Sequence, residues 1–243
     1  ILESRYSTVK TFIFESGEAN KNLNTIEKLY EYLIINYFER NDLLIALGGG
    51  VVGDMTGFAA ATYLRGIDFV QIPTTLLAQV DSSIGGKTGV DFAQYKNMVG
   101  AFNQPKLVYM NLDVLKTLPK EQFASGMAEA LKSGLIRDQE YFTYLCDEIK
   151  AIQSLEQEAI LRTVSGSCKI KREVVQNDPK EKGERALLNF GHTIGHAIEK
   201  LSDFTLYHGE CVALGMVAAA YISFKSGNIS KEEIGRASCR ERV

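Results

Sequence analysis

The feature that most constrains the fold is a change of pattern near Leu118 and Pro119. Before it, short apolar runs of strand length alternate with segments whose apolar residues recur at helical spacing. After it, from Glu121 to about Gly227, nearly all apolar residues follow the helical period. Because alternating strands and helices are typical of a parallel sheet covered by helices, we predict an α/β N-terminal half with a parallel, Rossmann-like sheet and an all-α C-terminal half.

The expected elements follow from these patterns. Four strands are expected in the first half, at 11–14, 43–47, 69–72 and 107–110, with helices at 22–38 and 53–64. The run 43–47 is apolar throughout, of the kind buried in parallel sheets. In the second half, helices are expected at 123–136, 140–149, 155–175, 188–201 and 209–225. The predicted domains are an α/β domain over 1–119, a helical domain over 120–233 and a tail over 234–243.

Composition excludes several classes of partner. The chain has 243 residues, 45% of them hydrophobic, and a net charge of -3, which argues against a nucleic-acid or anionic-membrane partner. The longest apolar stretch, 211–224, is shorter than the roughly 20 residues that span a bilayer. The four cysteines show no paired spacing, so we expect reduced thiols and a cytoplasmic protein.

Both ends of the sequence look atypical. The chain opens at Ile1 without a methionine, which favours a fragment. Residues 234–243 have no apolar periodicity, and their back-translation resembles a sequencing-adapter read, so we expect a non-native, unpacked tail. The alternative is a genuine basic tail.

A glycine-rich turn follows the predicted strand 43–47. Gly48, Gly50 and Gly53 satisfy G-x-G-x-x-G between a strand and a helix, where bare backbone and a helix N-terminus suit a pyrophosphate. The alternative is a plain strand–helix turn, and the acid that should end the next strand is missing, since Asp68 begins it. A second glycine run, after Asp81, lacks the first glycine of a P-loop, so ATP or GTP hydrolysis is excluded.

All three histidines lie between positions 192 and 208, which suggests a metal site. His192 and His196 are four residues apart on one helix face, and the spacing alone makes both candidate ligands. His196 could instead be a hydrogen-bonded interior histidine. A catalytic zinc takes three protein ligands, and Glu129, on an otherwise apolar helix, is the best candidate acid unless it is simply solvated.

Several basic residues lie in glycine-rich or apolar contexts instead of charge runs. On an acidic protein they suggest an anion pocket, although a surface salt bridge is the simpler reading of any one of them. These residues are Arg65, Lys87, Lys96, Lys132, Lys171 and Arg185.

Taken in order, six motifs closely resemble the 3-dehydroquinate synthase family, from about Ser16 to Gly227. They are Gly48–Asp54, Pro73–Thr75, Asp81–Thr88, Lys96–Asn97, Gly126–Glu129 and Leu188–His192. The resemblance implies a lyase of the shikimate pathway that converts 3-deoxy-D-arabino-heptulosonate 7-phosphate to 3-dehydroquinate and phosphate. It implies transient oxidation by NAD, β-elimination, reduction and aldol cyclisation.

The resemblance also implies the cofactors and the site residues. The cofactors are NAD and one divalent metal, zinc or alternatively cobalt, and the metal ligands are Glu129, His192 and His208. The resemblance implies that His196 contacts the substrate phosphate or relays a proton. It therefore replaces the metal-ligand role that the spacing suggested for His196. The implied NAD contacts are Glu18, Lys21, Gly49, Gly50, Val51, Val52, Gly53, Asp54, Thr74, Thr75, Lys87, Lys96 and Thr117. The implied substrate and catalytic residues are Asp81, Lys87, Lys96, Asn97, Lys132, Lys171, Arg185, Asn189 and His196.

The family also implies a homodimer in which Arg65 reaches the neighbouring subunit's phosphate site. The family's leading strands and final helices are absent from this sequence, so we expect the chain to bind NAD poorly and metal better. Three alternatives stay open: another sugar phosphate cyclase, a related polyol dehydrogenase and an inactive NAD-binding module. The Lys and Arg set favours a charged substrate, which disfavours the polyol dehydrogenases.

Overall fold

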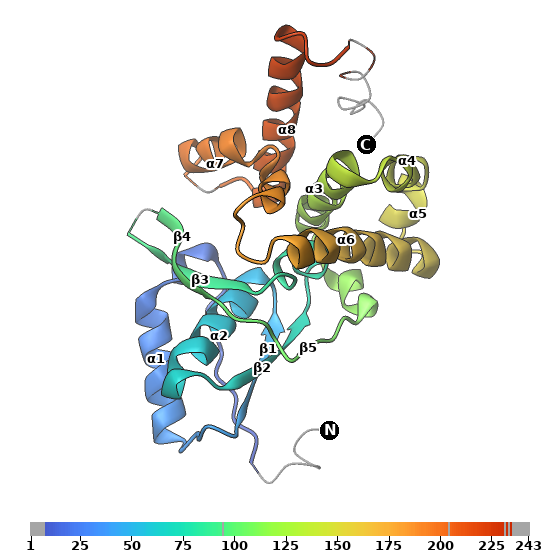
Figure 1. Cartoon of the computed structure of the whole chain (residues 1–243). Helices are drawn as coiled ribbons and strands as arrows, with labels where there is room; N and C mark the ends of the chain where they lie inside the picture. The colour runs from blue at the N-terminus through green and yellow to red at the C-terminus, as the bar shows by residue number, and fades with distance from the viewer. Residues whose placement is uncertain (1–7, 94, 204, 231, 233, 235–243) are drawn as a thin grey trace. The chain divides into compact units, whose positions relative to one another are not determined.

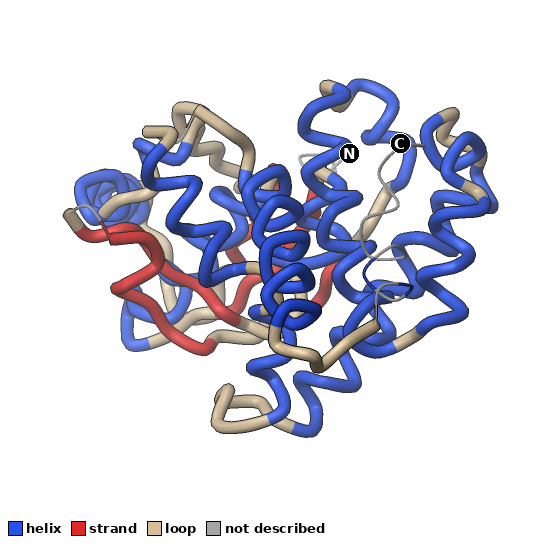
Figure 2. Tube along the Cα trace, turned by 90° about the horizontal axis from the view of Figure 1, so that it is seen from above, coloured by secondary structure: helices blue, strands red, loops and turns tan. Residues whose placement is uncertain are grey.

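A computed structural model describes residues 8–93, 95–203, 205–230, 232 and 234 (Figure 1). Two compact units are present: one combines the chain up to Pro73 with Gly86–Tyr109, and the other combines Thr74–Gly85 with the chain from Met110 onward. The chain therefore enters the second unit twice, whereas the sequence pattern suggested one change near residue 119. The predicted character of both halves is confirmed, with strands in the first unit and helices in the second (Figure 2).

The first unit is built on a parallel three-stranded sheet in the order β1-β2-β5. Its strands are β1 (Leu43–Gly48), β2 (Asp68–Pro73) and β5 (Leu107–Val108), and β1 pairs with β2 from Leu43↔Asp68 to Gly48↔Pro73. Helices α1 (Leu23–Ile35) and α2 (Gly50–Thr62) follow the predicted periodicity. Their inward faces form one apolar core with the sheet, and Phe69, Met55 and Ile26 are almost fully buried there.

Only one face of β1 is buried, which corrects the expectation of a strand covered on both sides. Leu44 and Ala46 point into the core, whereas Ile45 is 40% and Leu47 is 64% exposed. The strand therefore alternates despite its uniformly apolar sequence, since a side chain's direction in a strand is set by its position. An apolar run cannot reveal which of its residues face solvent.

An antiparallel hairpin in this unit has no counterpart among the predicted elements. It consists of β3 (Lys87–Phe92) and β4 (Tyr95–Phe102), paired from Lys87↔Phe102 to Val90↔Val99 with a bulge beyond. Gly89 and Gly100 lie opposite each other, and a Cβ on Gly100 would come within 2.3 Å of the Thr88 carbonyl oxygen. The hairpin was missed because charged residues and glycines interrupt its apolar alternation.

The strand predicted at 11–14 is wrong, because no strand is assigned there. Phe12 and Phe14 still pack against the core of the first unit, and Tyr32 donates a hydrogen bond to the Thr11 carbonyl oxygen. The alternation of exposed and inward residues therefore exists without a hydrogen-bonded ladder. A strand needs a paired neighbour, and periodicity in sequence does not supply one.

The second unit consists of helices packed around an apolar core that includes Leu76, Leu115 and Leu145. The predicted helices are confirmed, within a few residues, as α3 (Lys120–Arg137), α4 (Gln139–Asp147), α6 (Gln157–Asn177) and α8 (His208–Lys225). A short α5 (Ile149–Gln153) separates α4 from α6. Five shorter helical turns complete both units: η1 (Glu18–Asn20), η2 (Tyr63–Arg65), η3 (Ala78–Ser82), η4 (Leu112–Thr117) and η5 (Glu184–Asn189). No helix of the described residues is long and apolar enough to cross a membrane.

The helix predicted at 188–201 is broken at Gly191. Its backbone is left-handed there, with φ of 80°, so η5 ends before it and α7 (His192–Leu201) begins directly after it. Glycine adopts this conformation without the steric cost that a Cβ brings. The break makes His192 the first residue of a helix instead of a residue in its middle.

Candidate metal centre and active site

Glu129 is the buried acid at the centre of the second unit. It lies on α3 among Met127, Ala128 and Ala130, with only 1% of its surface exposed, so the alternative of a solvated residue is wrong. It forms a buried ion pair with Lys132, one turn along the same helix. Lys132 contacts Oε2, and Oε1 has no hydrogen-bond partner among the described residues. Burying an ionised carboxylate is costly unless a cation or a metal compensates it.

Two histidines face this carboxylate, and each is the first residue of a helix: His192 begins α7 and His208 begins α8. The Nε2 atom of His192 lies 3.8 Å and that of His208 lies 3.7 Å from Glu129 Oε1. These distances exceed hydrogen-bond length. Ligand atoms around a tetrahedral zinc lie about 3.3–3.4 Å apart, so the three side chains fit a shared ion after a small contraction.

Close helix packing holds the three candidate ligands together. The N–H of Gly209 donates to Ser125 Oγ at 2.9 Å, which ties the start of α8 to α3 one turn before Glu129. A Cβ on Gly215 would lie 1.9 Å from the Gly191 carbonyl oxygen, so α7 and α8 approach each other at backbone distance. Glycines at these helix contacts therefore allow α7 and α8 to come close enough to bring both histidines beside Glu129.

The electrostatic surroundings of the two histidines differ. Burial, with the charge of Lys132, lowers the pKa of His192 to about 4, which leaves this imidazole neutral and able to bind a metal. Burial also opposes protonation of His208, but Glu199 and Glu129 outweigh it and raise the pKa of His208. A divalent ion would therefore compete with a proton at His208 more than at His192.

His196, which spacing alone paired with His192, has a different position. It lies one turn further along α7 and is exposed, so the alternative of an interior histidine is wrong. Its ring centroid lies 5.2 Å from that of His192, but the group closest to Glu129 consists of His192 and His208. Helical spacing correctly put His192 and His196 on one side of a helix and could not show which of them faces α3.

Lysine side chains near Glu129 form ion pairs with buried or half-buried carboxylates. Lys171 of α6 donates to both the carbonyl oxygen (2.7 Å) and Oδ1 (2.6 Å) of Asp81. Arg185 is buried and donates from Nη1 to the Pro179 carbonyl oxygen and from Nη2 to the Gly85 carbonyl oxygen. Asn189 donates to Glu181. Of the predicted substrate contacts, Asp81, Lys132 and Lys171 thus form charged pairs within this unit.

The Asp81–Lys171 pair gives a prediction for acid stability. Burial raises the pKa of Asp81, but Lys171 and Lys132 outweigh it and hold the pKa well below its ordinary value. The stabilisation is therefore present above the unfolded-state pKa and is lost as pH falls through the folded-state pKa. We expect Lys171→Met to move the acid-unfolding midpoint to higher pH, measured by circular dichroism. Lys169→Met, on an exposed position of the same helix, serves as the control, and equal shifts in both variants would contradict a specific pair.

The predicted pyrophosphate turn lies in the first unit. Strand β1 ends at Gly48, Gly49 precedes α2, and α2 begins at Gly50, so the first N–H groups of α2 lie directly after a sheet strand. The N–H of Gly53 already donates to the Gly49 carbonyl oxygen. A Cβ on Gly48 would come within 2.7 Å of Val52. A bare turn at the carboxyl end of a parallel strand is suited to a phosphate group.

Several of the other predicted cofactor and substrate residues gather beside this turn. Lys21 is buried and donates to Asp54 Oδ2 and to Asn97 Oδ1, both at 2.6 Å. Glu18 lies 3.9 Å from Lys21 and 3.6 Å from Lys96. Burial opposes the charge on Lys21, but Asp54 and Glu18 outweigh it and raise the pKa of this lysine. Five positions separated by up to 79 in sequence therefore form one polar cluster in the first unit.

The remaining predicted residues lie apart from these clusters. Lys87 is exposed at the start of β3, and Arg65 is exposed at the end of η2. In the second unit, Thr74 and Thr75 are half-buried, and Thr75 Oγ1 accepts a hydrogen bond from the Ala78 N–H. Thr117 is exposed and donates to the Val114 carbonyl oxygen.

Sequence reasoning missed Glu199, a buried acid on α7. It is 3% exposed, and its Oε2 lies 3.7 Å from Nδ1 of His208. His196, Glu199 and His208 form a second group whose ligand atoms lie within 4.8 Å of one another. The signal available in sequence was an acid one turn after His196 on a helix of strong amphipathic pattern.

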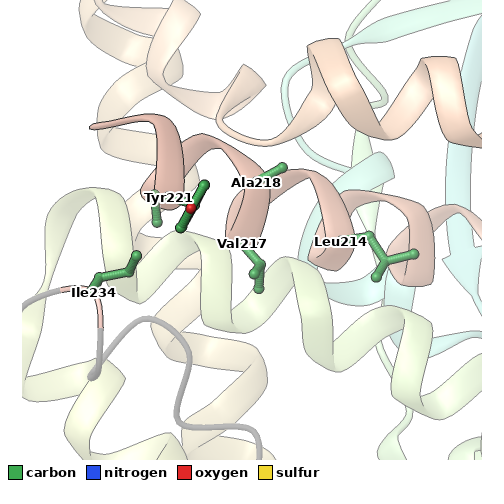
Figure 3. A pocket seen from close by; sticks show the side chains of 6 residues that line it. Leu214, Val217, Ala218, Tyr221 and Ile234 are labelled. Carbon is green, nitrogen blue, oxygen red and sulfur yellow. The ribbon is translucent and has the colours of Figure 1, made fainter. Parts of the chain in front are cut away.

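A pocket of about 440 Å³ lies on α8 and is lined by apolar side chains, with Tyr221 contributing the hydroxyl seen in Figure 3. Leu214, Val217 and Ile234 take part in the lining. The described residues that line it include no carboxylate, imidazole or thiol. Ile234 is the one residue of the predicted tail that is described, and the expectation for 235–243 concerns residues outside the described part.

Among the described residues, Cys146, Cys168 and Cys211 are not joined in disulfides. Burial raises the pKa of Cys168 to about 11. Its Sγ donates weakly to the Gln79 carbonyl oxygen. The thiol is therefore protonated and unreactive at neutral pH.

An α/β unit with a glycine turn and a helical unit with a Glu–His–His group define a class of two-unit folds. The fold is shared with a probable glycerol dehydrogenase from Sinorhizobium meliloti, with a TM-score of 0.70 at 16% identity over 97% of this chain and 69% of that one. Within the class, the family models "3-dehydroquinate synthase N-terminal" and "3-dehydroquinate synthase C-terminal" match residues 11–125 and 126–239. The chain belongs to the 3-dehydroquinate synthase family.

Individual relatives agree with this assignment. The 3-dehydroquinate synthase of Acetivibrio thermocellus is 52% identical over 228 residues, which are 94% of this chain and 63% of the relative. That of Symbiobacterium thermophilum is 53% identical over 93% of this chain and 63% of the relative. The chain thus spans just under two thirds of the length of these relatives.

Among solved structures, ValA (2-epi-5-epi-valiolone synthase) from Streptomyces hygroscopicus, with NAD+ and Zn2+ bound, has a TM-score of 0.87 at 30% identity. It covers 91% of this chain and 62% of its own. A 2-deoxy-scyllo-inosose synthase complexed with carbaglucose-6-phosphate, NAD+ and Co2+ has a TM-score of 0.86 at 32% identity, covering 92% of this chain and 61% of its own.

Proposed function

We propose that the complete protein is a 3-dehydroquinate synthase that converts 3-deoxy-D-arabino-heptulosonate 7-phosphate to 3-dehydroquinate and phosphate. The observation that carries the proposal is the buried Glu129, whose Oε1 atom has no hydrogen-bond partner and faces His192 and His208. The relatives that carry this name are about half identical in sequence over nearly the whole chain. We further propose that the protein acts in the cytoplasm.

The cofactors proposed are NAD and one divalent ion. Glu129, His192 and His208 would hold the ion, with zinc favoured by their nitrogen and oxygen ligands and cobalt as the alternative. The glycine turn at Gly48–Gly53, with Glu18, Lys21 and Asp54 beside it, would hold NAD. When bound, NAD supplies reversible hydride transfer and the ion acts as a Lewis acid. The solved relatives with NAD+ and Zn2+ or Co2+ support this pair.

The chain's own residues would bind and orient an anionic sugar phosphate. Lys132 and Lys171 are buried cations, and their present partners Glu129 and Asp81 keep their charges compensated before substrate arrives. Arg185 and Asn189 lie on the neighbouring turn η5, where they would contact the substrate's carboxylate or phosphate. Because these charged side chains are already held in place, they could orient an anionic substrate without having to move when it binds.

Turnover by the intact gene product tests the proposal. The release of phosphate and the formation of 3-dehydroquinate would be followed with the heptulosonate phosphate, with parallel assays after EDTA treatment and without NAD. We expect activity that both omissions abolish. Turnover of only those sugar phosphates that lack a carboxylate would replace the proposal with another sugar phosphate cyclase, and binding of NAD without any turnover would favour a non-catalytic module.

Two lysine variants test the substrate role. We expect Lys132→Ala and Lys87→Ala to lower turnover at least about tenfold, because a charge-assisted contact to a desolvated anion is worth about 1.5–3 kcal/mol. Turnover should fall more than NAD affinity in both variants, and Lys116→Ala, at an exposed position, should change neither quantity. Because Lys132 also pairs with Glu129, the metal content and the melting temperature of its variant are measured first. An equal loss of NAD affinity in both variants would assign these lysines to the cofactor.

We also propose a homodimer in which Arg65 contacts the partner's phosphate site. Arg65 is exposed, and the backbone at Leu64 and Arg65 is left-handed, with φ of 49° and 68°. Such conformations are costly for residues other than glycine and cluster at functional sites. Sedimentation of the intact protein and mixing of an Arg65→Ala variant with a Lys132→Ala variant would test it, since subunits that share sites should regain part of the activity.

A further inference from the structure

The imidazole of His208 lies between two buried carboxylates. Its Nε2 atom is 3.7 Å from Glu129 Oε1 on α3, and its Nδ1 atom is 3.7 Å from Glu199 Oε2 on α7. The two acids are 1% and 3% exposed. Each ring nitrogen therefore has its own acidic neighbour, on opposite edges of the ring.

We propose that Glu199 is a positioning residue, which closes the present 3.7 Å to accept the Nδ1–H of His208 and so directs the lone pair of Nε2 toward the ion held with Glu129 and His192. The inference rests on the metal site of the proposed function. A neutral imidazole carries one N–H, and the acceptor of that N–H decides which nitrogen is left to bind a metal. A carboxylate acceptor also increases the basicity of the ligand nitrogen.

The placement of Glu199 is built into the packing of α7 against α8. Gly195, one turn before Glu199, is so close to α8 that an added Cβ would lie 2.9 Å from the Cys211 carbonyl oxygen. Gly215 gives the same close approach from α8. These contacts keep the Glu199 carboxylate beside the first residue of α8 and away from solvent. A buried carboxylate is costly unless its neighbours compensate it, and the imidazole of His208 is one such neighbour.

The other ligand histidine has a different acceptor. Nδ1 of His192 lies 3.3 Å from the Phe190 carbonyl oxygen, which the left-handed turn at Gly191 brings back toward the ring. Both histidines thus direct Nδ1 to a fixed oxygen and Nε2 to Glu129. The ring of His192 is oriented by a backbone carbonyl oxygen, and the ring of His208 is oriented by the Glu199 carboxylate.

A second possibility is that Glu199 is itself a ligand, together with His196 and His208. That arrangement requires Nδ1 of His208 to bind an ion. The same ring would then bind two ions at once or leave Glu129 without its histidine, and a ring with both nitrogens metal-bound must lose its last proton. His196 is also exposed, unlike His192. The geometry therefore favours a hydrogen-bond acceptor over a ligand.

Metal binding by the chain tests the role without any assay of turnover. Zinc affinity would be measured by competition with a chromophoric chelator, and the Co2+ complex by its visible absorption spectrum and stoichiometry. We expect Glu199→Gln to bind one ion per chain with about 10–100-fold lower affinity, the usual cost of losing a partner that orients a ligand. The cobalt spectrum should shift, because an amide is a poorer acceptor than a carboxylate. Glu158→Gln, which removes an exposed acid of the same unit, should match the parent chain.

Further variants separate positioning from folding. Glu199→Asp keeps the charge with a shorter reach and should give an intermediate affinity, and melting temperatures show whether each variant is folded. In a His208→Ala background, Glu199→Gln should cause no further loss of affinity. An unchanged affinity in Glu199→Gln, or a parent chain that binds two ions of which Glu199→Gln loses one, would overturn the proposal. A parent chain that binds no zinc would instead overturn the metal site of the proposed function.

Discussion

Replacing Glu129 by glutamine is expected to weaken zinc binding by more than about 100-fold, beyond the usual cost of losing a residue that only orients a ligand. The amide keeps the size of the side chain but supplies a neutral oxygen in place of the anionic ligand. The substitution also leaves the buried Lys132 without its ion-pair partner, and breaking a buried pair typically costs about 3–5 kcal/mol. Calorimetric titration with zinc and urea unfolding of the metal-free chain would measure the two effects separately.

Two controls make this result specific. Glu140→Gln removes an exposed acid at the start of α4 and should change neither quantity. His196→Ala should reduce zinc affinity far less than His192→Ala, since His192 faces Glu129 and His196 is exposed. Equal losses in the two histidine variants would restore the assignment that helical spacing alone favours.

Gly215→Ala is expected to destabilise the chain by about 1–3 kcal/mol, the usual cost of overpacking. The direction of this stability change is informative, because replacing glycine by alanine normally stabilises a helix by about 1 kcal/mol. Here the added methyl would lie 1.9 Å from the Gly191 carbonyl oxygen and 2.8 Å from the Gly195 nitrogen, so α7 and α8 must separate. Since these helices carry His192 and His208, zinc affinity should fall together with stability.

Urea unfolding measures the stability change, and chelator competition measures the affinity. Gly53→Ala is a suitable comparison, because its added methyl would meet the movable end of the Gln71 side chain at 3.1 Å instead of backbone. It should be closer to neutral. A Gly215→Ala chain as stable as the parent would show that α7 and α8 can move apart freely, and the close approach would then not be what holds the histidines.

Local patterns predicted most of the fold because they report on single elements. The helices α1, α3, α4, α6 and α8 follow from apolar residues at helical spacing. The exceptions depend on information that a single segment does not contain. The segment 11–14 alternates correctly but has no ladder, and the hairpin of β3 and β4 is defined by the pairing of two weakly apolar segments.

The site could be predicted in part for the same reason. Glu129 was singled out because an acid on an apolar helix requires an explanation, and the structure places its Oε1 atom within 3.8 Å of both His192 and His208. Spacing favoured His196 as the second ligand, since it reports neighbours on one helix only. Glu199 was missed because its significance depends on the contact between α7 and α8, which arises from glycines far apart in sequence.

The three proposed ligands, Glu129, His192 and His208, lie on three different helices, α3, α7 and α8. An ion bound to all three would act as a cross-link, because unfolding any one of these helices would remove a ligand. Binding and unfolding would then be thermodynamically linked, and zinc at 100 times its dissociation constant would add about 2.7 kcal/mol to the free energy of unfolding. The melting temperature of the chain would in that case report the free zinc concentration around it, and chelation would loosen the helices before it affected the parallel sheet.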